Sequence, residues 1–339
     1  MHEPSLVFPA QEYRDRVMRL QARMAAQGVD ALLLTTAADV FYVSGFLTRF
    51  WESPARPWFV IVPQQGDPVA VIPSIGAPLM RRTWLSDIRT WDAPDPRDDG
   101  ISLLCDALAE KVPAAGSLGL PMGLETQLRM PLADYALLCA RLAPRTVVDA
   151  ADCLQRVREV KSAAEIAKIR DTCAIAGRAF ERVRASVAEG RLLSEVFRDF
   201  QIALLSEGAD WVSYVAGGAG PDGYLDVISP AGPQPLRRGD VLMLDTGAVK
   251  DGYFCDFDRN LAIGAASDTA RRAHAALWAA TEDVLAAIRP GWRASDVHAA
   301  FSAGLRRRGF SPSSGRLGHG LGVTLTRCAT SPAVQGGEG

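Results

Sequence analysis

The segment VLMLDTGAVKDGYFCDFDRNLAIG, residues 241–264, decides the fold that we predict for the C-terminal half of the chain. Two runs rich in β-forming residues flank Asp251-Gly252, and Asp-Gly between such runs is the strongest short-range signal for a hairpin turn with positive φ. If these two residues form the loop, Asp245 lies opposite Asp258, and Asp256 is the diagonal neighbour of Asp245. The segment therefore predicts an antiparallel hairpin that gathers three aspartates.

The three aspartates are expected to share one face of this hairpin, because side chains alternate between the two faces of a strand. Carboxylates that face one another repel, and an oxygen-preferring divalent cation between them would relieve that repulsion. An antiparallel hairpin also commonly has one solvated side, on which aspartates need no ligand. Spacing alone leaves both interpretations open.

Length and composition indicate an ordinary soluble protein of one large or two smaller domains. The chain has 339 residues, a formal net charge of -2 and 48% apolar residues. It has no charge excess that would favour nucleic acid or an acidic membrane surface, no apolar run as long as a membrane span and no basic-then-apolar signal segment. Its six cysteines form no CxxC pair and are expected to be reduced thiols. We therefore expect a cytoplasmic protein without nucleic-acid or membrane partners.

The N-terminal part, residues 1–155, alternates between helical and strand patterns, which predicts an α/β domain. Helices are expected at 10–28, 101–112 and 130–142, and strands at 29–35, 58–63, 67–73, 117–120 and 145–149. A turn followed by a short apolar segment is expected at 39–46. The domain boundary is predicted at 155–161, before the helix-capping sequence Ser162-Ala163-Ala164-Glu165, so that residues 156–339 form the second domain.

An irregular loop interrupts the N-terminal domain at residues 47–58, with the sequence LTRFWESPARPW. Arg49 and Arg56 suit a substrate carboxylate, and Trp51 suits an apolar or cationic group. The simpler interpretation, which applies to most loops, is that the arginines are solvated and the tryptophans pack on the domain. Loops nevertheless carry more than their share of binding sites, so these three residues are our candidates for substrate binding.

The last segment places a histidine among glycines, in Gly318-His319-Gly320-Leu321-Gly322. Flanking glycines allow the backbone to approach a neighbour or a ligand closely. His319 is thus a candidate metal ligand beside the aspartates, although an isolated histidine of this kind is more often an ordinary turn residue.

Together these motifs resemble a known metal-binding signature. Asp245-Thr246-Gly247, the later Asp256 and His319 in GHGLG are similar to the signature of the pita-bread metallohydrolases, which include aminopeptidase P, prolidase, methionine aminopeptidase and creatinase. The segment RVREVKSAAEIAKIR (156–170) resembles the junction into that family's catalytic domain, and GVDALLLTTAADVFYVSGF (28–46) resembles its creatinase-type N-terminal domain. The resemblance covers nearly the whole chain.

The resemblance implies an α+β catalytic domain with a curved antiparallel sheet backed by helices, and a site for two divalent metal ions. Asp245 would bind one metal, Asp256 would bridge both and His319 would bind the other. Two such cations lower the pKa of a shared water and polarise a scissile carbonyl. Carboxylate-rich ligation suits Mn, Co, Fe or Zn. The resemblance also implies a peptide or small-molecule substrate and a homodimer, in which the N-terminal domain can reach the neighbour's site.

The C-terminal tail departs from this family. Its members supply two glutamate ligands after the histidine, whereas this chain has only Glu338 there, and Arg327 stands where a glutamate would often follow. The tail TRCATSPAVQGGEG has no strand pattern. We therefore expect a chain that is truncated or frameshifted at its C-terminus, with an incomplete pita-bread sheet.

The loop before the first aspartate departs as well. Proline-specific peptidases of this family, and creatinase, carry a histidine there, but residues 212–240 contain none. Tyr224 and Asp226 are the catalytic candidates in this loop. Asp258 stands where Ser or Thr is more usual, and it is a candidate third metal ligand.

Three functions fit this pattern. The first is a hydrolase resembling Xaa-Pro aminopeptidase or prolidase, in which metal-activated water attacks an amide bond. The second is a family member that acts on a small zwitterion, as creatinase, ectoine-derivative hydrolases and a dimethylsulfoniopropionate lyase do; the arginines and tryptophans of the 47–58 loop would suit such a substrate. The third is an inactive truncated chain that lacks the two glutamate ligands.

Overall fold

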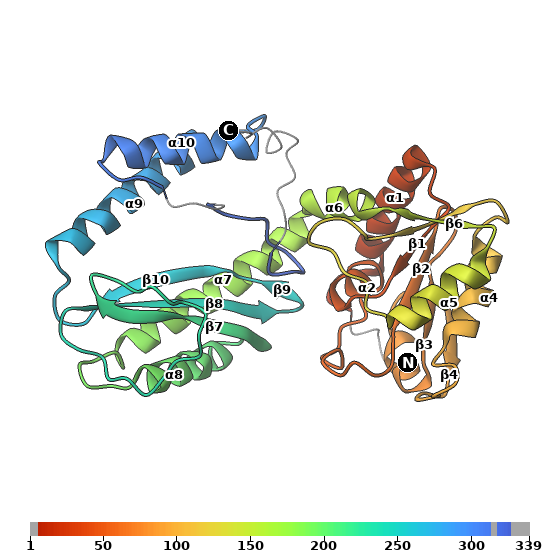
Figure 1. Ribbon diagram of the computed structural model, residues 1–339, viewed down its shortest axis with the longest axis horizontal. Helices are drawn as coiled ribbons and strands as arrows, with labels where there is room; N and C mark the ends of the chain where they lie inside the picture. The colour runs from red at the N-terminus through yellow and green to blue at the C-terminus, as the bar shows by residue number, and fades with distance from the viewer. Residues whose placement is uncertain (1–5, 313–316, 327–339) are drawn as a thin grey trace. The chain divides into compact units, whose positions relative to one another are not determined.

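The computed structural model describes residues 6–312 and 317–326 of the chain. The chain divides into two compact units, Met1–Ala164 and Glu165–Gly339 (Figure 1). Each unit has its own sheet, its own helices and its own hydrophobic core.

The first unit is built around a six-stranded mixed sheet with the strand order β4-β3-β2-β1-β5-β6. Its strands are β1 (Ala31–Leu34), β2 (Phe59–Pro63), β3 (Val69–Pro73), β4 (Asp87–Trp91), β5 (Ser117–Leu120) and β6 (Thr146–Asp149). All residues of β1, β2 and β3 are buried. Continuous apolar runs of this kind are typical of strands that are covered on both faces.

Helices cover both faces of this sheet. They are α1 (Ala10–Gln27), α2 (Ala37–Ser44), α3 (Ala77–Met80) after the short helical turn η1 (Ser74–Gly76), α4 (Ile101–Lys111), α5 (Leu132–Leu142) and α6 (Ala151–Glu159). Figure 1 shows α1 and α2 on one side of the sheet and α4 and α5 on the other. Helix α1 ends at Gly28, whose left-handed φ of 68° lets the chain turn toward β1. The predicted α/β domain is confirmed.

Helix α2 differs from the sequence prediction, which favours a turn and an apolar segment at 39–46. Thr36 precedes the helix, and its side chain accepts a hydrogen bond from the backbone N–H of Asp39, which satisfies one of the open donors at a helix start. Residues 39–44 are all buried. A helix that is buried on all sides has no polar face, so the 3.6-residue period by which helices are recognised is missing.

The second unit is built on an antiparallel sheet in the order β10-β8-β7, with β9 paired to β8. Its elements are α7 (Ala163–Arg184), α8 (Leu193–Ser206), β7 (Trp211–Pro221), β8 (Asp240–Lys250), β9 (Tyr253–Phe254), β10 (Phe257–Ala262), α9 (Asp268–Ala287) and α10 (Ala294–Arg307). Side chains of α7 and α8, among them Phe180 and Phe200, form one core with Leu242 and Leu244 of β8. These two helices therefore cover one face of the sheet (Figure 1).

The Asp-Gly hairpin forms as predicted. Strand β8 turns back through Asp251 and Gly252, whose φ values of 51° and 79° are the left-handed conformations that such a turn requires. Asp245 lies opposite Asp258 in the register of β8 and β10. The sequence thus predicts both the turn and the pairing correctly.

A short break separates β9 from β10 in the returning arm of the hairpin. Cys255 and Asp256 lie in this break, but the backbone N–H of Cys255 still donates to the carbonyl of Ala248 on β8 at 3.0 Å. Cys255 is fully buried in the core of the unit. Because neighbouring side chains in extended backbone point to opposite faces, Asp256 is directed to the face that Asp245 occupies.

Helices α9 and α10 pack on each other through small residues. The buried residues of α9 are Ala276, Ala280 and Val284, spaced one turn apart. A Cβ added to Gly304 of α10 would lie 3.2 Å from the Cβ of Ala280, so glycine allows the two helices to approach closely here. In the part of the chain that the structure describes, no helix is both long enough and apolar enough to cross a membrane.

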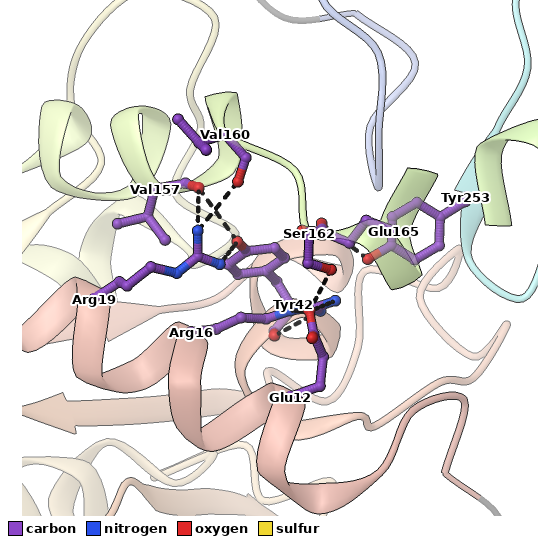
Figure 2. Close-up of polar contacts among 9 residues, drawn as sticks. All are labelled: Glu12, Arg16, Arg19, Tyr42, Val157, Val160, Ser162, Glu165 and Tyr253. Atoms are coloured by element: carbon purple, nitrogen blue, oxygen red, sulfur yellow. Dashed lines mark hydrogen bonds and ion pairs between the residues drawn. The ribbon is translucent and has the colours of Figure 1, made fainter. Parts of the chain in front are cut away.

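Hydrogen bonds hold the end of α6 and the residues after it to α1 (Figure 2). A terminal nitrogen of Arg19 donates to the carbonyl of Val160 at 3.1 Å and to that of Val157 at 3.5 Å. The hydroxyl of Ser162 donates to Oε1 of Glu12 at 2.8 Å. The segment that leads out of the first unit is thus fixed to that unit by backbone and side-chain contacts.

Candidate metal centre

The aspartates of the hairpin lie on the face of the sheet opposite α7 and α8. Leu242 and Leu244 point into the core beneath the sheet, so Asp245, the next residue along β8, points to the other face. Asp258 lies directly opposite Asp245 and shares that face. The hairpin register therefore brings these carboxylates together.

A tyrosine of the neighbouring strand β7 reaches the same face. The Tyr214 hydroxyl lies 2.7 Å from Oδ1 of Asp256, and 3.3 and 3.4 Å from Oδ1 and Oδ2 of Asp245. A phenol has one hydrogen to donate, and the shortest contact assigns it to Asp256. Tyr214 thereby connects carboxylates on the two arms of the hairpin.

Tyr214 is missing from the sequence prediction of the site because an irregularity in β7 directs it there. The pairing of β7 with β8 shifts between Val212 and Val215, so that Ser213 and Tyr214 both lie against Gly247. A Cβ on Gly247 would lie 2.3 Å from the ring of Tyr214. The glycine of the Asp-Thr-Gly motif therefore provides the space that this ring occupies.

His319 lies against Asp256. Its Nε2 is 3.0 Å from Oδ2 of Asp256, and its Nδ1 is 3.1 Å from the carbonyl oxygen of Gly320. The backbone N–H of Phe254 donates to the carbonyl of Gly322 at 3.0 Å, which ties the glycine-rich segment to the hairpin. The structure thus brings His319 to Asp256 of the hairpin from a distant part of the sequence.

The electrostatics of this cluster follow from burial and from an excess of negative charge. Burial raises the pKa of Asp245 to about 6, and the charges of Asp256 and Asp258 add to this shift. Burial also raises the pKa of Tyr214, and the hydrogen bond to Asp256 acts in the same direction. Tyr214 is therefore a neutral donor at physiological pH, whereas ionisation of Asp245 is opposed by its surroundings.

The chemistry of these side chains fits a divalent cation. Oxygen ligands from Asp245 and Asp256 with a nitrogen ligand from His319 are a donor set that Mn, Co, Fe and Zn accept, and a cation would relieve the repulsion felt at Asp245. The geometry of these side chains does not yet form a complete metal site. Among the residues that the structure describes, no group of three or more His, Cys, Asp or Glu side chains is placed to hold a metal ion. Glu338 and Arg327, which entered the sequence argument, lie outside the described residues.

The two catalytic candidates, Tyr224 and Asp226, lie in the connection between β7 and β8 and differ in position. The hydroxyl of Tyr224 donates to Oδ1 of Asn260 at 2.8 Å, and Nδ2 of Asn260 donates to Oδ2 of Asp258 at 3.0 Å. Burial raises the pKa of Tyr224, and the charge of Asp258 adds to this. Asp226 is exposed, and hydrogen bonds from the side chain and the backbone N–H of Ser229 lower its pKa. Tyr224 and Asp258 thus border the cluster, whereas the Asp226 side chain bonds to its own loop.

The candidate substrate-binding residues belong to the first unit and contact residues of that unit. Arg49 pairs with Oε1 of Glu52 at 2.6 Å. The guanidinium of Arg129 lies over the ring of Trp51, 5.3 Å from its centroid, and donates to the carbonyl of Arg56 at 3.5 Å. These contacts agree with the simpler interpretation of a loop packed on its own domain, and the sequence offers no sign of the part that Arg129 plays.

Comparison with known families agrees with the geometry of the second unit. The sequence profile of the metallopeptidase family M24 matches residues 167–338, and that of the creatinase/prolidase N-terminal domain matches residues 16–160. The chain belongs to the metallopeptidase family M24. The resemblance stated from the Asp-Thr-Gly and Gly-His-Gly motifs is thereby confirmed.

Relatives of this M24 chain share most of its length. A protein of Mycobacterium bovis named "Probable dipeptidase PepE" is 29% identical over 326 residues, which cover 94% of this chain and 82% of that protein. The crystal structure of dipeptidase PepE from Mycobacterium ulcerans is 26% identical, with a TM-score of 0.78, and covers 94% of this chain and 83% of its own. An ectoine hydrolase of Halomonas elongata is 24% identical in an alignment 348 positions long, and this alignment covers 96% of this chain and 84% of that protein. The likeness to the PepE structure confirms the predicted pita-bread fold.

Proposed function

We propose that this M24 chain is a metal-dependent hydrolase that cleaves the peptide bond of short Xaa-Pro substrates. The observation that carries the proposal is that the Tyr214 hydroxyl contacts both Asp245 and Asp256 while His319 lies against Asp256. A partly buried group of like charges beside an imidazole suits a divalent cation that binds oxygen and nitrogen ligands. The relatives that are named as dipeptidases support a short peptide as the substrate.

In this proposal, Asp245, Asp256 and His319 hold the metal. Two divalent cations, when bound, supply a water of lowered pKa and polarise the scissile carbonyl. Tyr214 keeps its hydrogen on Asp256 and so fixes the direction of that carboxylate. Tyr224 stays protonated because burial raises its pKa, and it donates its hydrogen to Asn260 at the border of the cluster.

Elemental analysis and a peptide assay test this function on the full chain. After dialysis against Mn²⁺, Co²⁺ or Zn²⁺, the folded protein is expected to retain metal and to hydrolyse Xaa-Pro dipeptides, and a chelator is expected to stop the reaction. Asp256→Asn is expected to lose both properties. Folded protein that retains no metal and cleaves no dipeptide would support the third interpretation, an inactive chain.

A small zwitterion is the second candidate substrate. The ectoine hydrolase of Halomonas elongata is among the relatives, and residues 212–240 contain no histidine of the kind that the peptidases carry. A parallel panel of creatine, ectoine derivatives, dimethylsulfoniopropionate and Xaa-Pro dipeptides separates the two candidates. Turnover of a zwitterion without turnover of any dipeptide would replace the peptidase proposal.

A further inference from the structure

We infer that Tyr214 is a positioning residue, which sets the direction of the Asp256 carboxylate beside Asp245 and thereby controls the affinity of the site for a divalent cation. The inference rests on the metal site proposed above, and it concerns a residue outside the predicted ligand set. Its basis is that each residue of the Asp245-Thr246-Gly247 motif contacts Tyr214.

The hydroxyl of Tyr214 holds one oxygen of Asp256, and the other oxygen faces His319. Oδ1 of Asp256 accepts the tyrosine hydrogen at 2.7 Å, and Oδ2 lies 3.0 Å from Nε2 of His319. Because the tyrosine hydrogen bonds one of these oxygens, the carboxylate cannot rotate about its Cβ–Cγ bond without losing this hydrogen bond. Each oxygen keeps a second lone pair for another partner. Tyr214 therefore selects one orientation of Asp256 and leaves it able to bind a cation.

The other two residues of the motif hold the tyrosine itself in place. The hydroxyl of Thr246, which is fully buried, donates to the backbone carbonyl of Tyr214 at 3.1 Å. Gly247 leaves room for the ring, since a Cβ there would lie 2.3 Å from it. The backbone of Tyr214 is anchored and its ring is confined, so its hydroxyl has a fixed position relative to both carboxylates.

Tyr214→Phe tests the inference with the smallest change. The variant keeps the ring and its packing over Gly247 and removes only the hydroxyl. Hydrogen-bond partners of metal-binding carboxylates typically contribute 10–100-fold to metal affinity. We therefore expect the dissociation constant for Co²⁺ to rise by about 10–100-fold. Gly247→Ala should act in the same direction, because a methyl group at this position displaces the ring.

Tyr253→Phe is the matched control. Tyr253 lies on the same hairpin, its side chain is fully buried, and its hydroxyl donates to Oε1 of Glu165 at 3.1 Å (Figure 2). This variant also removes a tyrosine–carboxylate hydrogen bond from the second unit, but it leaves Asp256 untouched. A general loss of stability lowers the melting temperature of both phenylalanine variants, whereas only Tyr214→Phe should change the affinity for the cation.

Calorimetric titration with Co²⁺ and the visible absorption spectrum of the bound cobalt measure the effect in the full chain. Weaker binding with an altered spectrum in Tyr214→Phe, and unchanged binding in Tyr253→Phe, is the expected result. An equal or tighter dissociation constant in Tyr214→Phe overturns the positioning role and leaves the metal site intact. A wild-type chain that binds no Co²⁺, Mn²⁺ or Zn²⁺ overturns the proposed function and this inference together.

Discussion

Two polar clusters of the molecule differ in the balance of their charges. In the first unit two buried arginines each have a carboxylate partner: Arg158 pairs with Asp39 at 2.7 Å, and Arg16 pairs with Glu12 at 3.0 Å. Arg16 is fully buried and also lies over the ring of Tyr42, 4.5 Å from its centroid (Figure 2). The fold itself therefore neutralises the charges of this first cluster.

The hairpin cluster of the second unit has the opposite character. Asp245 lies opposite Asp258, Asp256 lies beside His319, and burial with the charges of Asp256 and Asp258 raises the pKa of Asp245 to about 6. An excess of one charge that the fold does not balance is a physical reason to expect a bound ion of the other sign. The comparison thus separates charges that stabilise the fold from charges that serve a ligand.

Arg158→Ala should break the balanced cluster and produce the largest effect. The side chains of Arg158 and Asp39 are 8% and 7% exposed, and removal of one partner from a buried ion pair costs about 3–5 kcal/mol in the free energy of unfolding. Urea denaturation measures this loss. Arg156→Ala is the control, because Arg156 lies on the same helix and pairs with Asp152 and Glu159, whose side chains are 51% and 30% exposed; the loss should stay at about 1 kcal/mol, which is what such solvent-exposed pairs contribute. Equal losses in the free energy of unfolding of the two variants would contradict the difference expected between the buried and the exposed ion pair.

Asp245→Asn should act on ligand binding rather than on folding. We expect the dissociation constant for Mn²⁺ to rise by on the order of 100-fold, because the site loses a ligand and a negative charge. The free energy of unfolding of the chelator-treated protein should not fall, since a repelling charge is removed. Asp210→Asn is the control, because that carboxylate has its own cation, Lys250, at 2.7 Å. Calorimetric titration compares the variants, and wild-type affinity in Asp245→Asn would remove Asp245 from the ligand set.

The hairpin that carries the three aspartates could be predicted because it depends only on residues that are close together in the sequence. Asp251-Gly252 selects the turn, the turn fixes the register, and the register brings Asp245 to Asp258 without help from the rest of the molecule. Tyr214 could not be placed in this way. Its position depends on a shift in the pairing of another strand, and the space beside Gly247 becomes meaningful only when both strands are in view.

The first unit shows the same limit. Its central strands are continuous buried runs, which a sequence displays directly, and they lie where the pattern predicts them. The position of the 47–58 loop depends instead on Arg129, which is distant in the sequence. Arg129 donates to the carbonyl of Trp51 at 3.3 Å. No periodicity connects residues so far apart, so the sequence left the packed and the ligand-binding interpretations of this loop undecided.

The pH dependence of stability should reveal the excess charge at Asp245. Its folded pKa of about 6 lies above the ordinary value of 3.8. Between these values the folded state holds a proton that the unfolded state releases, so this contribution to stability is complete below about pH 4 and is lost as the pH rises through about 6. After allowance for solvent screening, chelator-treated wild type should lose up to about 2 kcal/mol more than Asp245→Asn over this range. Parallel urea-denaturation curves across the range would contradict the shift.

The smallest effect on stability is expected at Arg49. This residue tests whether a charge of the first unit serves a ligand, as the charges of the hairpin cluster are proposed to do. Its ion pair with Glu52 joins side chains that are 50% and 77% exposed, so Arg49→Ala should change the free energy of unfolding by less than about 0.5 kcal/mol. If Arg49 binds the carboxylate of the substrate, its loss raises KM and leaves kcat nearly unchanged. Glu52→Ala removes the same ion pair and keeps the guanidinium. If KM rises only in Arg49→Ala, the guanidinium of Arg49 binds the substrate, and Arg49 serves a ligand as the hairpin aspartates do. If KM is unchanged in both variants, Arg49 belongs with the charges that the fold itself balances.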